Sequence, residues 1–276
     1  MQMKTINKEE VILFKYIIIS SFLKRNVLIH VFLPKDFPLI KKMPLLLIND
    51  GQNMEEVGLK KILQELFQTK EINPLCCVAI EAGPDRKREY GVAGVPDYQG
   101  LGNKADLYAS FILQELLPFL QKTYPDLTFT YKSFAGFSLG GLSAMDIVWH
   151  HPEVFKVAGV FSGSLWWRSM DAKDIKYNDD QHRIMHNQIR KGTFHPGTKF
   201  FFQCGNMDEM LDRNNNGIID SIDDTLDLIK DLEAKGYDKN KDIFYYEMPD
   251  GHHDMPTWAK ALPVFLKWGF GGNVNG

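Results

Sequence analysis

The fold of this chain is decided by the stretch Phe129-Thr-Tyr-Lys-Ser-Phe-Ala-Gly-Phe-Ser-Leu-Gly-Gly-Leu-Ser-Ala-Met145. Residues 129–135 have the composition of a buried strand, and residues 142–151 have helical periodicity that stops at Pro152. Between them lies the motif Gly-x-Ser-x-Gly, with Ser138 at its centre. A strand, a tight turn carrying a serine and then a helix are the context of a nucleophile elbow. The stretch predicts that Ser138 is a nucleophile, and the competing interpretation is an ordinary glycine-rich turn.

The rest of the chain alternates strand-like and helix-like segments around this stretch. The predicted strands outside it are 11–20, 26–33, 44–49, 75–81, 157–161, 199–204 and 243–248, and the predicted helices are 55–69, 105–124, 181–190, 225–235 and 257–268. This order predicts a single α/β domain over residues 1–276, with a mostly parallel central sheet flanked by helices and an antiparallel N-terminal strand pair. The polar, irregular residues 168–197 are expected to form an excursion that walls a substrate site.

Composition excludes several classes of partner. A net charge of −3 over 276 residues provides no electrostatic reason to expect nucleic acid or an anionic membrane as a partner, and it leaves the oligomeric state open. Cys76, Cys77 and Cys204 lie in apolar runs and are expected to be buried free thiols.

No run has transmembrane length, and residues 1–10 are too polar for a signal peptide. The chain as written is therefore predicted to be cytoplasmic, while a secreted form with a removed leader stays open.

A base and an acid should follow the serine in chain order. His252 and His253 come just after the last predicted strand, on the sheet edge where the elbow lies, so one of them can reach Ser138 as a general base. Asp208 follows the preceding strand and is the candidate acid. Glu209 and Asp212 are its competitors, and the alternative for Asp208 alone is a solvated loop carboxylate.

These motifs together resemble the esterase D-like branch of the α/β-hydrolases, which includes siderophore esterases, feruloyl esterases and mycolyl transferases. The matching segments are 46–52, 136–141, 204–208 and 251–258. In that family the catalytic histidine stands five residues before a tryptophan, so counting back from Trp258 selects His253. The resemblance also implies that the backbone N–H groups of Leu139 and Gln52 form the oxyanion hole. The chain departs from many relatives at residues 100–102, where Gly-Leu-Gly replaces Gly-Arg-Gly.

The activity that follows is a serine esterase, in which Ser138, His253 and Asp208 hydrolyse a carboxylic ester through an acyl-enzyme without an organic cofactor. The substrate would be an acyl or feruloyl ester of a carbohydrate, or a siderophore ester. The alternatives are an acyltransferase with the same triad and a non-catalytic carbohydrate-binding relative. Trp166 and Trp167 either line the substrate pocket or fill the core.

A second motif lies at residues 212–223, where Asp-Arg-Asn-Asn-Asn-Gly-Ile-Ile-Asp-Ser-Ile-Asp has the spacing of an EF-hand-type loop. It resembles the dockerin version of that loop, which ends in Asp. Oxygen atoms at alternate positions would wrap one structural Ca²⁺, from Asp212, Asn214, Asn216, the Ile218 carbonyl, Asp220 and Asp223. The alternative is an Asn-Gly surface turn that precedes a helix.

Overall fold

A computed structural model of the protein describes residues 9–272, which form one eight-stranded sheet with the order β1-β2-β4-β3-β5-β6-β7-β8. β1 pairs with β2 and β2 with β4 in antiparallel fashion, and every later pairing in the sheet is parallel. The strands are β1 (Val11–Ser20), β2 (Arg25–Pro34), β3 (Lys42–Asn49), β4 (Cys76–Ile80), β5 (Thr128–Phe137), β6 (Val157–Phe161), β7 (Lys199–Met207) and β8 (Ile243–His252). The predicted α/β fold and its antiparallel opening pair are confirmed.

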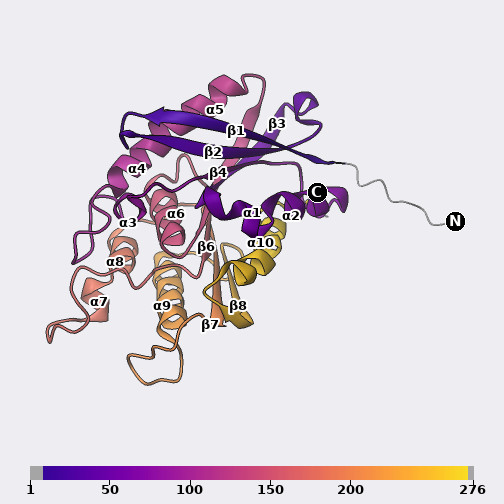
Figure 1. The fold of residues 1–276 in the computed structure, drawn as a ribbon. Coiled ribbons are helices and arrows are strands. Elements are labelled where there is room, and N and C mark those ends of the chain that lie inside the picture. The colour runs from indigo at the N-terminus through magenta and orange to yellow at the C-terminus, as the bar shows by residue number, and fades with distance from the viewer. Residues whose placement is uncertain (1–8, 273–276) are drawn as a thin grey trace.

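Helices cover both faces of the sheet (Figure 1). One layer contains α4 (Ala105–Phe111), α5 (Leu117–Thr123), α6 (Leu139–His150), α8 (Ile184–Lys191) and α9 (Asp220–Lys235). The other contains α1 (Met54–Val57), α2 (Leu59–Gln68) and α10 (Met255–Phe270). The short helices α3 (Arg86–Glu89) and α7 (Asp179–His182), the 3₁₀ turns η1 (Phe37–Leu39) and η2 (Gly51–Asn53) and a π-helical turn, η3 (Ile112–Leu116), complete the elements.

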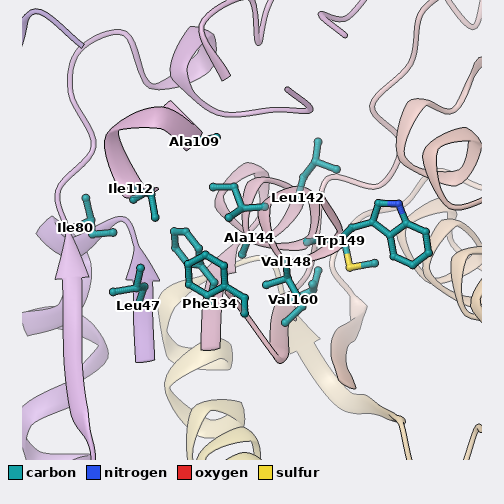
Figure 2. Close-up of a cluster of buried hydrophobic side chains, with 14 of the residues drawn as sticks. Leu47, Ile80, Ala109, Ile112, Phe134, Leu142, Ala144, Val148, Trp149 and Val160 are labelled. Atoms are coloured by element: carbon teal, nitrogen blue, oxygen red, sulfur yellow. The ribbon is translucent and has the colours of Figure 1, made fainter. Parts of the chain in front are cut away.

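The core has two halves because side chains alternate across each strand. On β3, Leu45 and Leu47 point to the α6 side, whereas Leu46 and Ile48 point to the α10 side. Figure 2 shows part of the first half, where Phe134 of β5 lies among side chains of β3 and α6. The strands buried on both faces hold the elbow between two packed layers, which positions Ser138 at the carboxyl edge of the sheet.

Several predicted elements differ in detail from the structure. The helix expected over residues 181–190 is divided at Arg183 into α7 and α8. The helix expected over residues 55–69 is divided at Gly58, which adopts a left-handed conformation (φ 73°). The helix expected over residues 105–124 passes through the π turn η3 just before Pro118, whose missing N–H weakens the regular ladder. The helix expected over residues 225–235 begins earlier, at Asp220, within the predicted calcium loop.

Two further predictions concern compartment and thiols. The prediction that residues 1–10 are not a signal peptide concerns a segment of which residues 1–8 lie outside the described residues. Within residues 9–272 the structure has no helix that is both long and apolar enough to span a membrane. Cys76, Cys77 and Cys204 are buried free thiols, as predicted.

Candidate active site

Ser138 occupies a sharp turn between β5 and α6. Its backbone has φ 53° and ψ −124°, a conformation that costs a non-glycine residue about 1–3 kcal/mol and that the surrounding structure must impose. A Cβ atom at Gly136 would lie 2.3 Å from the carbonyl oxygen of Gly140, so the strand and helix can approach only with glycine there. The Gly-x-Ser-x-Gly stretch therefore adopts the elbow geometry.

The register of the parallel strands brings the predicted site residues to one edge. Phe137 lies opposite Phe161, and Phe161 lies opposite Gln203, so the residues that follow β5, β6 and β7 emerge together. His252 pairs with Met207, which places His253 next to the segment that carries Asp208. The close approach of β7 and β8 requires glycine, because a Cβ atom at Gly205 would lie 2.2 Å from the carbonyl oxygen of Gly251.

The two backbone amides predicted for the oxyanion hole have no acceptor among the described residues. Leu139 is the first residue of α6, so its N–H has no partner within the helix. Gln52 lies in η2, directly after the left-handed residue Asp50 (φ 61°) and Gly51. Within the part of the chain that the structure describes, neither N–H donates a hydrogen bond to a backbone or side-chain oxygen. Both amides remain available for an anionic oxygen.

Asp208 and His253 influence each other electrostatically. Burial raises the pKa of Asp208, and the nearby Ser162 hydroxyl, the Gly205 backbone and His253 act in the opposite direction. Burial lowers the pKa of His253, although the residue retains surface exposure, while Asp208 and Asp254 raise it. In residues 9–272 neither carboxylate oxygen of Asp208 has a hydrogen-bond partner at regular geometry, although Ser162 lies close enough to affect its pKa. The carboxylate therefore has free acceptor capacity beside the imidazole.

The competing candidates are engaged elsewhere. The Glu209 carboxylate accepts a hydrogen bond from the Ser221 N–H (2.7 Å) at the start of α9. The Asp212 carboxylate accepts from the backbone N–H groups of Asn216 (3.1 Å) and Gly217 (2.9 Å). His252 and His253 are both exposed, and His253 is the one whose charge lowers the pKa of Asp208.

A cavity of about 350 Å³ opens beside Ser138. Trp166 and Trp167 both line it, Trp166 with 40% of its surface exposed and Trp167 only 2%. Trp167 also packs in the core, and the substrate-binding role of both tryptophans stays a prediction. The Ser164 hydroxyl, another lining group, lies 3.4 Å from Ser138 Oγ.

Other lining residues come from a segment in which the sequence analysis noted only residues 100–102. Between β4 and α4 the lining residues are Arg86, Lys87, Asp97, Tyr98, Gln99 and Leu101. No residue of 168–197 lines this cavity, so the role expected for that excursion stays a prediction. The polar composition of the loop after the predicted strand 75–81 could have indicated this wall, because ligand sites in α/β folds lie at the carboxyl ends of the strands.

The side chains of the predicted calcium loop, residues 212–223, form hydrogen bonds with other groups of the same loop. The amide groups of Asn214 (2.9 Å) and Asn216 (2.8 Å) both donate to one oxygen of Asp223. The Asp220 carboxylate accepts from the Arg213 N–H (2.8 Å), and Ile218 donates its own N–H to the Asn216 side chain (2.8 Å). In the described residues no group of three or more His, Cys, Asp or Glu side chains is arranged to hold a metal ion. The structure therefore does not support the calcium prediction.

This fold and this strand–Ser138–helix turn define an α/β-hydrolase. A family model described as "Putative esterase" matches residues 20–268, so the chain belongs to this esterase family. The resemblance to esterase D-like hydrolases is confirmed at the level of family and fold.

Similar proteins cover most of this chain at low identity. The uncharacterized protein YjcH of Bacillus subtilis (strain 168) is 22% identical over 250 residues, which are 90% of this chain and 93% of YjcH. A crystal structure of the enterobactin esterase FES from Shigella flexneri in the presence of enterobactin superposes with a TM-score of 0.72 at 23% identity, and covers 94% of this chain. This chain spans only 59% of that protein. The structure of a ferulic acid esterase has a TM-score of 0.69 at 19% identity, with 95% of this chain and 98% of that protein covered.

Proposed function

We propose that the chain is a serine esterase whose nucleophile is Ser138. The observation that carries the proposal is the strained backbone of Ser138, held at φ 53° between two glycines and open to a cavity. Such strain persists only where the surrounding structure maintains it, and it is typical of a functional turn. Membership of an esterase family supports the same reaction type.

The proposed reaction uses three side chains and two amides. Ser138 Oγ attacks the ester carbonyl while His253 accepts the hydroxyl proton, and Asp208 orients the imidazole and stabilises its charged form. The N–H groups of Leu139 and Gln52 bind the tetrahedral oxyanion. His253 then protonates the leaving alcohol, and water attacks the acyl-enzyme to release the acid. Hydrogen bonds among such groups often tighten only when substrate is bound, which fits the free acceptors of Asp208.

The lining of the cavity supports an ester with an aromatic part. The exposed face of Trp166 and the ring of Tyr98 offer stacking surfaces, and Arg86 and Lys87 favour a negatively charged or catecholic group. We therefore propose a feruloyl or other acyl ester of a carbohydrate, or a siderophore ester, as the substrate class. The names of the ferulic acid esterase and of the enterobactin esterase support these candidates.

An ester panel tests the proposal. Purified wild type and Ser138→Ala should be assayed against p-nitrophenyl acetate, methyl ferulate and a catecholate ester of serine. Ser138→Ala should lose about six orders of magnitude in kcat, as nucleophile removal does in other triads, and should melt at an unchanged temperature. Ser169→Ala is the matched control, because Ser169 is exposed and outside the cavity lining. Substantial activity in pure Ser138→Ala would contradict the assignment. Transfer of the acyl group to an added sugar in preference to water would instead identify an acyltransferase.

Calcium binding by residues 212–223 stays a proposal supported by the spacing of its oxygen-bearing side chains. An ion that binds only the folded state stabilises it by mass action. Addition of calcium after chelation should then raise the melting temperature, and a melting curve indifferent to both would reduce the loop to a surface turn.

A further inference from the structure

We infer that Asp50 and Arg86 form a positioning pair that holds the oxyanion loop in place and balances the charge beside the elbow. The inference rests on the proposed esterase function and assigns Arg86 a role that extends from the loop into the substrate cavity. Three sets of contacts carry it, at Asp50, at Arg86 and around His253.

Asp50 begins the oxyanion loop, the turn η2 that contains Gln52. It adopts a left-handed conformation (φ 61°, ψ 47°) at the end of β3, and its carbonyl accepts the Asn53 N–H (3.0 Å) that closes the η2 turn around Gln52. Its side chain is 2% exposed. A Cβ atom at Gly140 would lie 2.7 Å from Asp50 Oδ2, so this carboxylate packs against the first turn of α6, next to Leu139. A buried negative charge thus lies close to the place where the reaction develops a second one.

Arg86 neutralises that charge with a two-pronged ion pair. Its Nε lies 2.6 Å from Asp50 Oδ1 and its Nη2 lies 2.7 Å from Oδ2, the bidentate geometry that fixes a carboxylate in orientation as well as in charge. The guanidinium also lies over the ring of Tyr90, at 5.0 Å from its centroid, and the Tyr90 hydroxyl accepts the Asp50 N–H (3.3 Å). Arg86 of α3 therefore holds the Asp50 side chain, and Tyr90, directly after that helix, holds the Asp50 backbone.

Arg86 reaches the reacting groups as well. Its side chain is 31% exposed and lines the same cavity as Ser138, while its Nε and Nη2 atoms hold Asp50. The Arg86 charge lowers the pKa of His253, whereas the carboxylates of Asp208 and Asp254 raise it. The pair therefore controls both the position of the Gln52 N–H and the charge felt by the general base.

The two members of the pair should have opposite effects on His253. Arg86→Gln leaves the Asp50 charge uncompensated and should raise the pKa of His253. Asp50→Asn leaves the Arg86 charge uncompensated and should lower it, and the double variant should lie between them. A purely structural role would move both single variants in the same direction or not at all. Because the base must be neutral, the acidic limb of the kcat/KM profile should move to higher pH in Arg86→Gln and to lower pH in Asp50→Asn.

The experiment combines kinetics with a measurement that needs no turnover. On the full chain, both single variants should lose about 100-fold in kcat toward an uncharged ester, the size of effect expected when a reacting geometry is displaced by about 1 Å. The pKa of His253 should be followed by NMR, with the ring signal assigned from His253→Ala. Arg88→Gln is the matched control, because Arg88 carries the same charge on the same helix, is exposed and does not line the cavity.

The outcomes separate the two proposals. Opposite shifts of the His253 signal with a parallel loss of kcat support the pair. Folded single variants with kcat within about twofold of wild type and an unmoved His253 signal overturn it, since a misplaced donor would cost far more. A wild type that hydrolyses no ester and takes up no uncharged phosphonate at Ser138 refutes the esterase function, and the NMR shifts still report whether the pair controls His253.

Discussion

Trp258 connects the segments that carry the proposed catalytic side chains. Its indole stacks on Phe137, the residue before Ser138, with 5.0 Å between ring centroids and 14° between planes. It meets the His253 ring edge to face at 5.1 Å, and its N–H donates to the Ser162 hydroxyl (2.9 Å), which lies near Asp208. An indole has no acceptor, so Ser162 must accept here and its own proton is free for another acceptor such as Asp208. The buried Trp258 side chain thus contacts Phe137, His253 and Ser162 together.

This arrangement distinguishes the adjacent histidines. We expect His253→Ala to lose about six orders of magnitude in kcat, as removal of the base does in other triads. His252→Ala should keep most of the activity, because the contact of His252 with Thr257 uses its backbone N–H (2.9 Å), which alanine retains. Steady-state kinetics on the two folded variants provide the measurement. The opposite ranking would show that the position of Trp258 does not identify the base.

At the scale of elements, the loop after β7 is fastened to the start of α9 by protein groups. The Asp220 N–H donates to the Leu211 carbonyl (2.8 Å), and the Ser221 N–H donates to Glu209. Arg213 joins the same region to Asp179 (2.8 Å) and to the buried carboxylate of Asp224 (2.6 Å). The Arg213 guanidinium therefore anchors this loop through its ion pairs.

We predict that Arg213→Met lowers the free energy of unfolding by about 2 kcal/mol. The loss of one partner of a buried pair usually costs about 3–5 kcal/mol, and here Arg183 remains paired with Asp224 (2.8 Å) to reduce it. Urea denaturation measures the change. Lys230→Met is the control, because its surface ion pair with Asp227 should contribute less than about 1 kcal/mol.

The same variant should lower kcat, because Asp208 lies on the fastened loop. An Arg213→Met protein with unchanged stability and unchanged kcat would show that this ion-pair network does not anchor the loop.

At the scale of the whole molecule, the distance between the sheet and α10 determines where His253 and Trp258 lie relative to Ser138. Gly159 of β6 sets that distance, since a Cβ atom there would lie 2.8 Å from the Phe265 ring and 2.9 Å from the Ala135 Cβ. Helix α10 can pack closely against β6 only because Gly159 has no side chain. The packing of α10 on the sheet therefore depends on the absence of a side chain at Gly159.

Gly159→Ala should destabilise the fold by about 1–3 kcal/mol, the usual cost of overpacking a dense core. It should also reduce kcat, because α10 carries Trp258. Gly269→Ala is the control within α10, where the added Cβ atom would lie 4.0 Å from Phe265 and should be tolerated. Thermal melting and kinetics on both variants test the prediction, and equal behaviour of the two would contradict it.

Local patterns in the sequence were sufficient to predict the strands, the approximate positions of the helices and the elbow. Side-chain periodicity and the positions of Gly136, Gly140 and Pro152 are local signals, so residues 157–161 were predicted with the observed bounds and Ser138 was placed in its turn. The order of strands and helices also determined the α/β class, because alternating elements can bury their apolar faces in few ways.

The contacts between residues far apart in the chain could not be predicted from local patterns and are set by the packing of the whole fold. Asp50 and Arg86 are 36 residues apart, and Trp258 and Ser162 are 96 apart, and no local pattern connects either pair. Such contacts depend on the order β1-β2-β4-β3-β5-β6-β7-β8 and on the register of neighbouring strands. The use of residues 86–101 as the cavity wall and of Arg213 as the loop anchor has the same origin. Periodicity reports which face of an element is buried, whereas the partner on that face is chosen by the packing of all elements together.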